Sequence, residues 1–226
     1  MTRFAMDGSR GWFITFEGID GSGKTTQLEM LAQRLREQGI AVTMAREPGG
    51  TPVGEAIRRI LLDSATVRLS PVAEVLLYFA SRAQNVVEVI QPALEAGQVA
   101  LCDRYVDASA AYQGAGRGLG QAVVSELERI ACRGLKPDLT FVLDIAPATS
   151  VARALERNQG AARLGREDES RFEREGLEFF TRVRRAYLEI AEREPERVVV
   201  VDGERTPDAI HAEIWEKVVE RLTFNV

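Results

Sequence analysis

The sequence lacks the features that mark membrane, secreted and nucleic-acid-binding proteins. None of its apolar runs approaches the roughly 20 residues that a membrane-spanning helix needs. Its first residues carry no signal-peptide pattern, so we expect only a loose extension over residues 1–10. A net charge of −5 provides no basic footprint for nucleic acid. We therefore expect a cytoplasmic protein whose partners include neither a membrane nor a nucleic acid.

The sequence also contains few cysteines and histidines. The two cysteines, Cys102 and Cys132, lie in apolar stretches and lack the spacing of metal ligands, which indicates a reduced pair in a cytosolic protein. The single histidine, His211, falls on the last expected helix, and we assign it no role. With 226 residues and 45% apolar content, the chain predicts one domain with one sizeable core.

Short aliphatic runs alternate with helical patterns along the chain. This alternation predicts an α/β fold, a three-layer α/β/α sandwich of the P-loop NTPase type with a five-stranded parallel sheet and helices on both faces. Aliphatic runs without strict alternation suit strands that are covered on both sides. The expected strands are 12–16, 40–45, 99–102, 139–143 and 198–201. The expected helices are about 24–38, 52–62, 71–96, 121–133, 147–157 and 167–193, with a last one opened by Thr206-Pro207.

A complete phosphate-binding loop follows the first expected strand and leads into a helix. Gly18, Gly21 and Gly23 allow the backbone to bring its N–H groups against phosphate oxygens. Lys24 is expected to reach the β- and γ-phosphates, and the Thr25 hydroxyl to ligate Mg²⁺ beside them. The residues expected to bind ATP are Gly18, Ile19, Asp20, Gly21, Ser22, Gly23, Lys24, Thr25 and Thr26.

In sheets of this kind the ligand lies beyond the carboxyl ends of the strands. Asp103 follows a strand at a point where a carboxylate can hold Mg²⁺ directly or through water, and Arg104 can meet a phosphate there. An ion pair that only caps the strand end is the alternative. The stretch Arg46 to Thr51 either approaches a ligand or merely connects to a helix capped by Thr51. Asp144 follows the fourth strand.

The expected helix 71–96 carries a core stripe at three- and four-residue steps: Val72, Val75, Leu76, Phe79, Ala83, Val86, Val87, Ile90 and Leu94. Tyr78, Arg82 and Asn85 lie on a flank outside this stripe. The aromatic ring could stack a base while the arginine one turn later bonds its edge, and a solvated flank is the alternative.

Arginines become frequent between residues 153 and 174. We interpret this region as a mobile lid whose arginines converge on the phosphates, because phosphoryl-transfer transition states are stabilised by positive charge. A solvated pair of charged helices is the alternative, since acidic residues are interspersed.

Taken together, these motifs resemble those of the bacterial thymidylate kinases, within the nucleoside-monophosphate kinase group, from about residue 13 to residue 222. The matching segments are FEGIDGSGKTT at 16–26, REPGGT at 46–51, DRY at 103–105 with AYQG at 111–114, PD at 137–138 and LD at 143–144. The resemblance implies ATP- and Mg²⁺-dependent conversion of dTMP to dTDP by direct in-line phosphoryl transfer, and a homodimer.

The resemblance also implies roles for individual residues. The catalytic set would be Asp20, Lys24 and Arg104 with lid arginines Arg157, Arg163 and Arg166, which we do not rank. The substrate-binding set would be Asp20, Arg46, Pro48, Tyr78, Arg82, Arg104, Ser109, Tyr112 and Gln113, and the metal ligands Thr25 and Asp103. Tyr112 would close under the deoxyribose, where a 2′-hydroxyl would clash.

This chain departs from the family pattern at three points. Tyr78 stands where the family often has phenylalanine, and Ala108-Ser109 replaces a paired serine or threonine. The phosphate loop lacks the arginine that some members carry, which is why we expect the lid to supply it.

Two other functions remain open. A deoxynucleoside kinase would need a base for a neutral 5′-hydroxyl, and Glu47 could serve. A nucleotide-dependent binding switch would use the same loop to order segments around the γ-phosphate.

Overall fold

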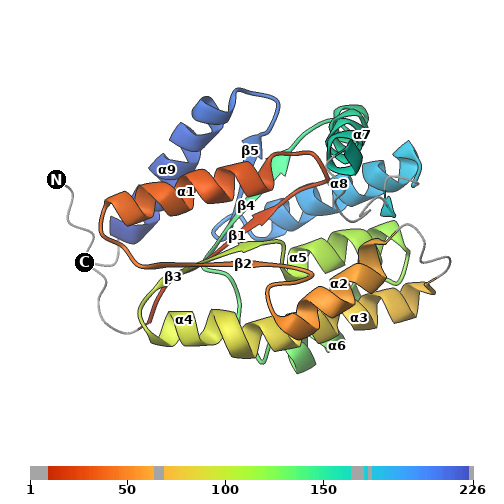
Figure 1. Ribbon diagram of the computed structural model, residues 1–226, viewed down its shortest axis with the longest axis horizontal. Coiled ribbons are helices and arrows are strands. Elements are labelled where there is room, and N and C mark those ends of the chain that lie inside the picture. Colours follow the sequence, from red (N-terminus) through yellow and green to blue (C-terminus); the bar gives the residue numbers. More distant parts are fainter. Residues whose placement is uncertain (1–9, 64–68, 164–170, 173–174, 224–226) are drawn as a thin grey trace.

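The computed structural model describes residues 10–63, 69–163, 171–172 and 175–223 (Figure 1). Five parallel strands form one sheet in the order β2-β3-β1-β4-β5, which confirms the expected α/β architecture. Their bounds are β1 Phe13–Glu17, β2 Val42–Arg46, β3 Val99–Asp103, β4 Leu139–Asp144 and β5 Val198–Asp202. Each expected strand is present, shifted by no more than two residues at either end.

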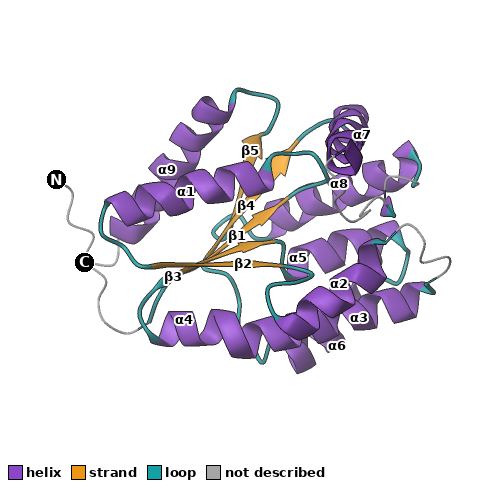
Figure 2. Ribbon diagram, viewed as in Figure 1, coloured by secondary structure: helices purple, strands orange, loops and turns teal. Residues whose placement is uncertain are grey.

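Helices cover both faces of the sheet (Figure 2). Helices α1 (Lys24–Glu37) and α9 (Pro207–Thr223) pack on one face. The other face carries α3 (Pro71–Asn85) and α5 (Val106–Ser109), each continued by a π-helical segment, together with α8 (Leu177–Arg193). Helix α2 (Pro52–Leu62) packs on α3, α6 (Gln121–Ala131) also contacts α3, and α7 (Pro147–Arg163) contacts α8. Within the described ranges, no helix combines the length and hydrophobicity needed to cross a bilayer.

The strands lack a polar face because both of their faces are buried. On β1, Phe13 contributes to the core under α3 and α8, whereas its neighbour Ile14 contributes to the core under α1 and α9. On β4, Phe141 contributes to the core under α1 and α9, and its neighbour Val142 contributes to the core under α3 and α8. This is the expected result of side chains alternating across a sheet that is covered on both sides.

The expected helix 71–96 is interrupted. It runs as α3, a π-helical segment η1 (Val86–Ile90) and α4 (Gln91–Glu95). Pro92 has no N–H for an α-helical bond to Glu88, so the helix widens just before it. The stripe was also wrong in part, because Val72, Leu76 and Val87 are exposed.

The solvated-flank alternative for this helix is wrong too. Arg82 and Asn85 are buried, and Tyr78 is half-buried. The buried sector of α3 therefore includes polar side chains that hydrophobic periodicity could not identify.

One helical segment was not predicted at all. Residues 106–116 form α5 and the π-helical η2 (Ala110–Gly116), buried on almost every side. Burial all round removes the periodicity, and glycines mask the propensity. At Gly116 a Cβ would lie 2.7 Å from the Phe179 ring, so the glycine permits close approach of α8.

Two helix boundaries near the expected lid also differ. Helix α7 continues to Arg163 instead of ending near residue 157. Helix α8 begins at Leu177, not near residue 167, because the backbone is extended at Gly176, which precedes it. Residues 1–9 of the expected loose extension lie outside the described part. Its last residue, Arg10, is held by an ion pair with Asp138.

Candidate active site

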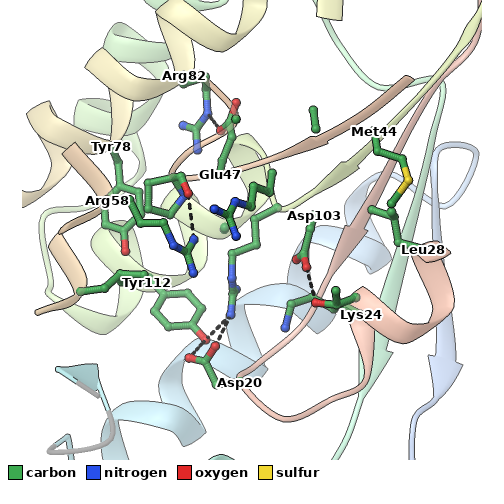
Figure 3. A pocket seen from close by; sticks show the side chains of 18 of the residues that line it. Asp20, Lys24, Leu28, Met44, Glu47, Arg58, Tyr78, Arg82, Asp103 and Tyr112 are labelled. Carbon is green, nitrogen blue, oxygen red and sulfur yellow. Dashed lines mark hydrogen bonds and ion pairs between the residues drawn. The ribbon is translucent and has the colours of Figure 1, made fainter. Parts of the chain in front are cut away.

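A cavity of about 680 Å³ opens beyond the carboxyl ends of β1, β2 and β3, where the sheet topology predicts a ligand (Figure 3). Tyr78, Arg82 and Glu47 lie at one end, and Lys24 and Asp103 lie at the other (Figure 3). With this volume, the cavity is large enough to hold a base-sized group and a phosphate group together.

The phosphate loop has the backbone that its glycines require. Gly18, Gly21 and Gly23 all have positive φ, and a Cβ on Gly18 would lie 2.5 Å from the Leu143 carbonyl oxygen. The Ser150 hydroxyl donates to the Asp20 carbonyl at 2.5 Å and holds the loop from α7. Arg153, on the same helix, donates to the Gly21 carbonyl at 3.4 Å.

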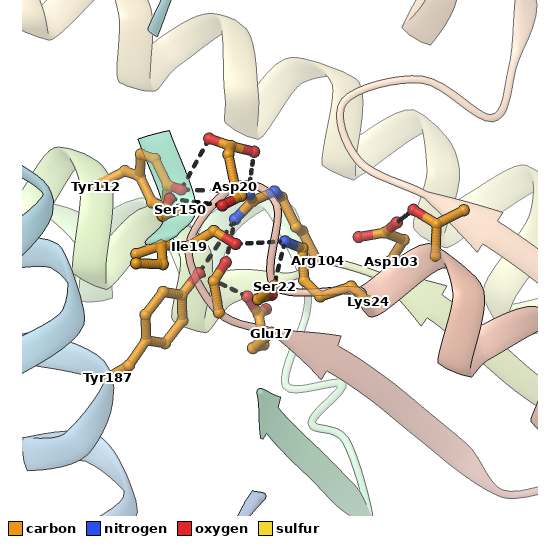
Figure 4. Close-up of polar contacts among 12 residues, drawn as sticks. Glu17, Ile19, Asp20, Ser22, Lys24, Asp103, Arg104, Tyr112, Ser150 and Tyr187 are labelled. Carbon is orange, nitrogen blue, oxygen red and sulfur yellow. Dashed lines mark hydrogen bonds and ion pairs between the residues drawn. The ribbon is translucent and has the colours of Figure 1, made fainter. Parts of the chain in front are cut away.

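Lys24 is folded back onto its own loop. Its Nζ donates to the Ile19 carbonyl at 3.0 Å and to the Ser22 hydroxyl at 3.4 Å (Figure 4). Burial, followed by the neighbouring Arg104 cation, lowers the pKa of Lys24 from 10.5 to about 8. An incoming phosphate would replace these neutral acceptors with charged ones.

The two expected metal ligands lie side by side. The Thr25 hydroxyl donates to Asp103 Oδ2 at 2.6 Å, from α1 to the end of β3. Among the described residues, no cluster of three or more histidine, cysteine or acidic side chains could hold a metal on its own. A hydroxyl beside one carboxylate suits Mg²⁺ that is shared with phosphates and water.

Arg104 lines the cavity and has an unusual backbone conformation. Its φ of 69° is left-handed, which costs free energy for a residue other than glycine. Its NH2 donates to Asp20 Oδ1 at 2.7 Å and to the Tyr112 hydroxyl at 3.2 Å, and that hydroxyl also donates to Asp20 Oδ2 at 3.0 Å. Asp20, Arg104 and Tyr112, all predicted site residues, thus form one hydrogen-bonded group.

A buried acid that we did not predict supports this group. Glu17 accepts the Tyr105 backbone N–H at 2.7 Å and the Tyr187 hydroxyl at 2.8 Å, and Tyr187 in turn accepts from Arg104 NH1 at 3.3 Å (Figure 4). Burial, assisted by the charge of Asp107, raises the pKa of Glu17 to about 7. Tyr187 lies 170 positions from Glu17, so no local pattern could connect them.

At the other end of the cavity, Arg82 is fixed by three acceptors. Its Nε donates to Glu47 Oε2 at 2.5 Å, NH1 to the Ser109 hydroxyl at 3.0 Å and NH2 to the Tyr105 carbonyl at 2.7 Å. The adjacent Glu47 charge outweighs desolvation and raises the pKa of Arg82. Burial raises the pKa of Glu47. Both side chains are 1% exposed.

Of the remaining residues expected to contact the base, some line the cavity and one does not. Gln113 lines the cavity, as do Tyr78 and Tyr112. Ser109 lies behind Arg82 as its acceptor and is not among the lining residues. Burial raises the pKa of Tyr78, whose hydroxyl is therefore protonated at neutral pH.

The end of β2 and the helix that follows it each place an arginine at the cavity, the first expected and the second not. Arg46 and Pro48 line the cavity, and Arg46 forms an ion pair with Glu55 at 2.9 Å. Arg58, on α2, also lines it and donates to the Pro48 carbonyl at 2.8 Å. Arg58 lies two helical turns after the Thr51 cap. This spacing places it on the same side of helix α2 as the cap, so it could have been identified from the sequence.

Two of the three expected lid arginines lie on helix α7. Arg157 and Arg163 belong to α7, but their side chains, like the whole of Arg166, lie outside the described residues. Asp144 is engaged by Arg184 at 2.6 Å and 2.7 Å and does not line the cavity.

Comparison with known proteins identifies the family of this chain. The family model for thymidylate kinase matches residues 16–214. A thymidylate kinase of Deinococcus radiodurans is 50% identical over 213 residues, which are 94% of this chain and 98% of that protein. One from Geotalea uraniireducens is 49% identical over 212 residues, with the same shares.

A solved structure agrees with the sequence comparisons. The crystal structure of thymidylate kinase from Ehrlichia chaffeensis superposes with a TM-score of 0.73 at 31% identity, covering 92% of this chain and 98% of that one. A family match over most of the sequence, near-full-length relatives and a matching fold lead to one conclusion: the chain belongs to the thymidylate kinase family.

Proposed function

We propose that the chain transfers the γ-phosphoryl group of ATP to dTMP, giving dTDP and ADP, in a Mg²⁺-dependent, direct in-line reaction. The observation that carries this proposal is that one cavity is lined by Lys24 of the phosphate loop, by the buried pair Arg82–Glu47 and by Arg104. Because the donor and acceptor phosphates would both border Arg104, its guanidinium is suited to neutralise charge on the transferring group.

The acceptor requires little proton chemistry. A monophosphate oxygen is already ionised at neutral pH, so orientation and charge neutralisation supply most of the acceleration. Lys24 would hold the donor phosphates, and Arg46 and Arg58 would border the monophosphate. Asp20 keeps Arg104 in place through the 2.7 Å bond, and Tyr112 would close under the deoxyribose. The lid arginines Arg157, Arg163 and Arg166 would complete the positive surroundings and exclude water.

The donor set at Thr25 and Asp103 supports Mg²⁺ as the cofactor, since both side chains offer hard oxygen atoms 2.6 Å apart at the phosphate end. When bound, Mg²⁺ would neutralise developing charge on the β- and γ-phosphates.

The decisive experiment measures ADP formation with ATP and Mg²⁺, offering dTMP, dUMP, UMP and thymidine in parallel. Strong turnover with dTMP and little with UMP or thymidine is the expected result. Preference for thymidine would instead make the chain a nucleoside kinase, although Glu47 already accepts bonds from Arg82 and Asn85. Tight ATP binding with no turnover on any acceptor would favour the binding switch.

ATP affinity should depend on pH through Lys24. In the free protein its pKa is about 8, and a bound phosphate must raise that pKa because the charged amine binds the anion. Above pH 8 binding therefore takes up a proton, and the Kd should rise about tenfold per pH unit. Calorimetry at pH 8.5 in two buffers of different ionisation enthalpy measures this uptake. The Lys24→Arg variant, which stays charged, should show no uptake, and zero uptake in the unmodified protein would contradict the assignment.

The homodimer that the family resemblance implies is also part of the proposal. Aliphatic side chains that are each more than a third exposed gather on the adjoining helices α2, α3 with η1, and α6, where they could meet a second copy. They are Val53, Ile60, Val72, Leu76, Val87, Val123 and Ile130. The buried free cysteines Cys102 and Cys132 are consistent with the proposed cytoplasmic location.

A charge on this face should separate the copies. Leu76→Glu is expected to convert a dimer, of twice the chain mass of 25.0 kDa, into a monomer, because one carboxylate from each copy would be buried at the interface. Light scattering after gel filtration measures the mass. Val200→Glu on β5 is the matched control, since Val200 is a similarly exposed aliphatic residue on another element. A monomeric unmodified protein at tens of micromolar would refute the dimer.

A further inference from the structure

Glu74 is a buried acid on α3 whose two carboxylate oxygens are both occupied. Its Oε1 accepts Gln113 Nε2 at 2.9 Å and Arg117 Nε at 3.1 Å. Its Oε2 lies 2.8 Å from Arg171 NH2. The side chain is 1% exposed, so these contacts, and not water, fix it in place.

The contact with Glu74 determines which end of the Gln113 amide faces the cavity. A carboxylate can only accept hydrogen bonds, so the NH₂ group must point toward Glu74 and the amide oxygen away from it. Gln113 lines the cavity, and no donor among the described residues occupies its Oε1. The side chain therefore offers the cavity an acceptor.

An acceptor at this position distinguishes pyrimidines. Thymine and uracil carry an N3–H donor, whereas N3 of cytosine is itself an acceptor. We propose that Glu74 is a positioning residue that determines specificity, because it holds the Gln113 amide with its oxygen toward the base and so favours pyrimidines with N3–H over cytosine. This inference rests on the proposed function, in which the base lies at this end of the cavity.

The surrounding arginines explain how Glu74 performs this role. Arg117 and Arg171 approach it from η2's end and from the segment before α8, and each places a positive charge against the carboxylate. Both Glu74 oxygens already face donors, so the reversed amide would place the Gln113 oxygen in contact with a carboxylate oxygen. A site with one imposed orientation rejects the wrong hydrogen-bonding pattern more strongly than one that can adapt.

The test compares the equilibrium dissociation constants of dTMP, dUMP and dCMP by calorimetry in the unmodified protein and in Glu74→Gln. The amide at position 74 can face Gln113 with its NH₂ group, which lets Gln113 turn its own NH₂ toward the base. The ratio of Kd for dCMP to Kd for dTMP should fall about tenfold, the worth of one good hydrogen bond. The ratio for dUMP to dTMP should not change, because both bases carry N3–H.

Two further variants separate positioning from general damage. Glu175→Gln also removes a carboxylate that pairs with Arg117 but does not contact Gln113, and it should leave both ratios unchanged. In a Gln113→Met background, adding Glu74→Gln should change the dCMP ratio less than twofold, because the mediator is gone. A tenfold fall in that background, or an unchanged ratio in the single variant, would overturn the proposal.

One measurement needs no substitution at Glu74, in case that variant does not fold. In NMR spectra, the signals of the Gln113 side-chain NH₂ group can be assigned by their loss in Gln113→Met. Because this group faces Glu74, its protons should exchange slowly with solvent, and its signals should shift little when dTMP binds. Large shifts on binding would show that the NH₂ group faces the base and would overturn the proposal. If the unmodified protein bound dCMP as tightly as dTMP, thymine recognition, and with it the proposed function, would be wrong.

Discussion

Replacing Arg104 with alanine is expected to lower kcat about 10³-fold, the scale on which a catalytic arginine stabilises phosphoryl transfer. Its guanidinium lines the cavity and is hydrogen-bonded to Asp20 and Tyr112. Arg104→Lys should recover little of this loss, because an ammonium cannot donate in the same planar, two-pronged geometry. Steady-state kinetics with ATP and dTMP measure the effect, which should appear mainly in kcat.

The left-handed backbone of Arg104 provides an internal control. Glycine adopts a φ of 69° without strain, whereas alanine does not. If Arg104→Gly and Arg104→Ala lose the same activity, the side chain and not the backbone is responsible. Arg184→Ala removes an arginine that pairs with Asp144 outside the cavity, and its kcat should stay within threefold. Retention of more than a tenth of kcat by Arg104→Ala would refute the assignment.

Removing the Glu47 carboxylate should destabilise the protein by about 3–5 kcal/mol, the usual cost of leaving one partner of a buried ion pair uncompensated. In Glu47→Gln, Arg82 keeps its bonds to Ser109 and Tyr105 but remains a buried charge without its counter-ion. Denaturant unfolding measures the change in free energy. Because Arg82 is expected to bond the thymine, the KM for dTMP should also rise.

Glu55→Gln is the matched control for this loss. It breaks the Arg46–Glu55 pair on neighbouring elements, whose side chains are 54% and 37% exposed, and it should cost no more than about 1 kcal/mol. Equal destabilisation by the two variants would mean that burial of the Arg82–Glu47 pair does not matter.

The phosphate loop and the five strands could be predicted from sequence because their signals are local. Aliphatic runs indicate strands that are buried on both faces. The spacing of Gly18, Gly21, Gly23 and Lys24 places flexible backbone and a positive charge within one short loop, which is the pattern of a phosphate-binding loop. The order of the strands then brings Asp103 next to Thr25 at one edge of the sheet. The family resemblance added the roles of Arg82, Tyr112 and Gln113, which periodicity could not assign.

Tertiary packing decided what surrounds those residues. Periodicity could not show that the polar flank of α3 is buried while Val72 and Leu76 on its apolar stripe are exposed, since a stripe records hydrophobicity and not what covers it. The partners Glu17–Tyr187 and Glu74–Gln113 are 170 and 39 positions apart, and only the folded chain brings them together. The sequence by itself determined the backbone of the phosphate loop, because one continuous segment builds it. The tertiary structure decided how the arginines and the Gln113 amide are held, because their orientation depends on buried acids contributed by distant segments.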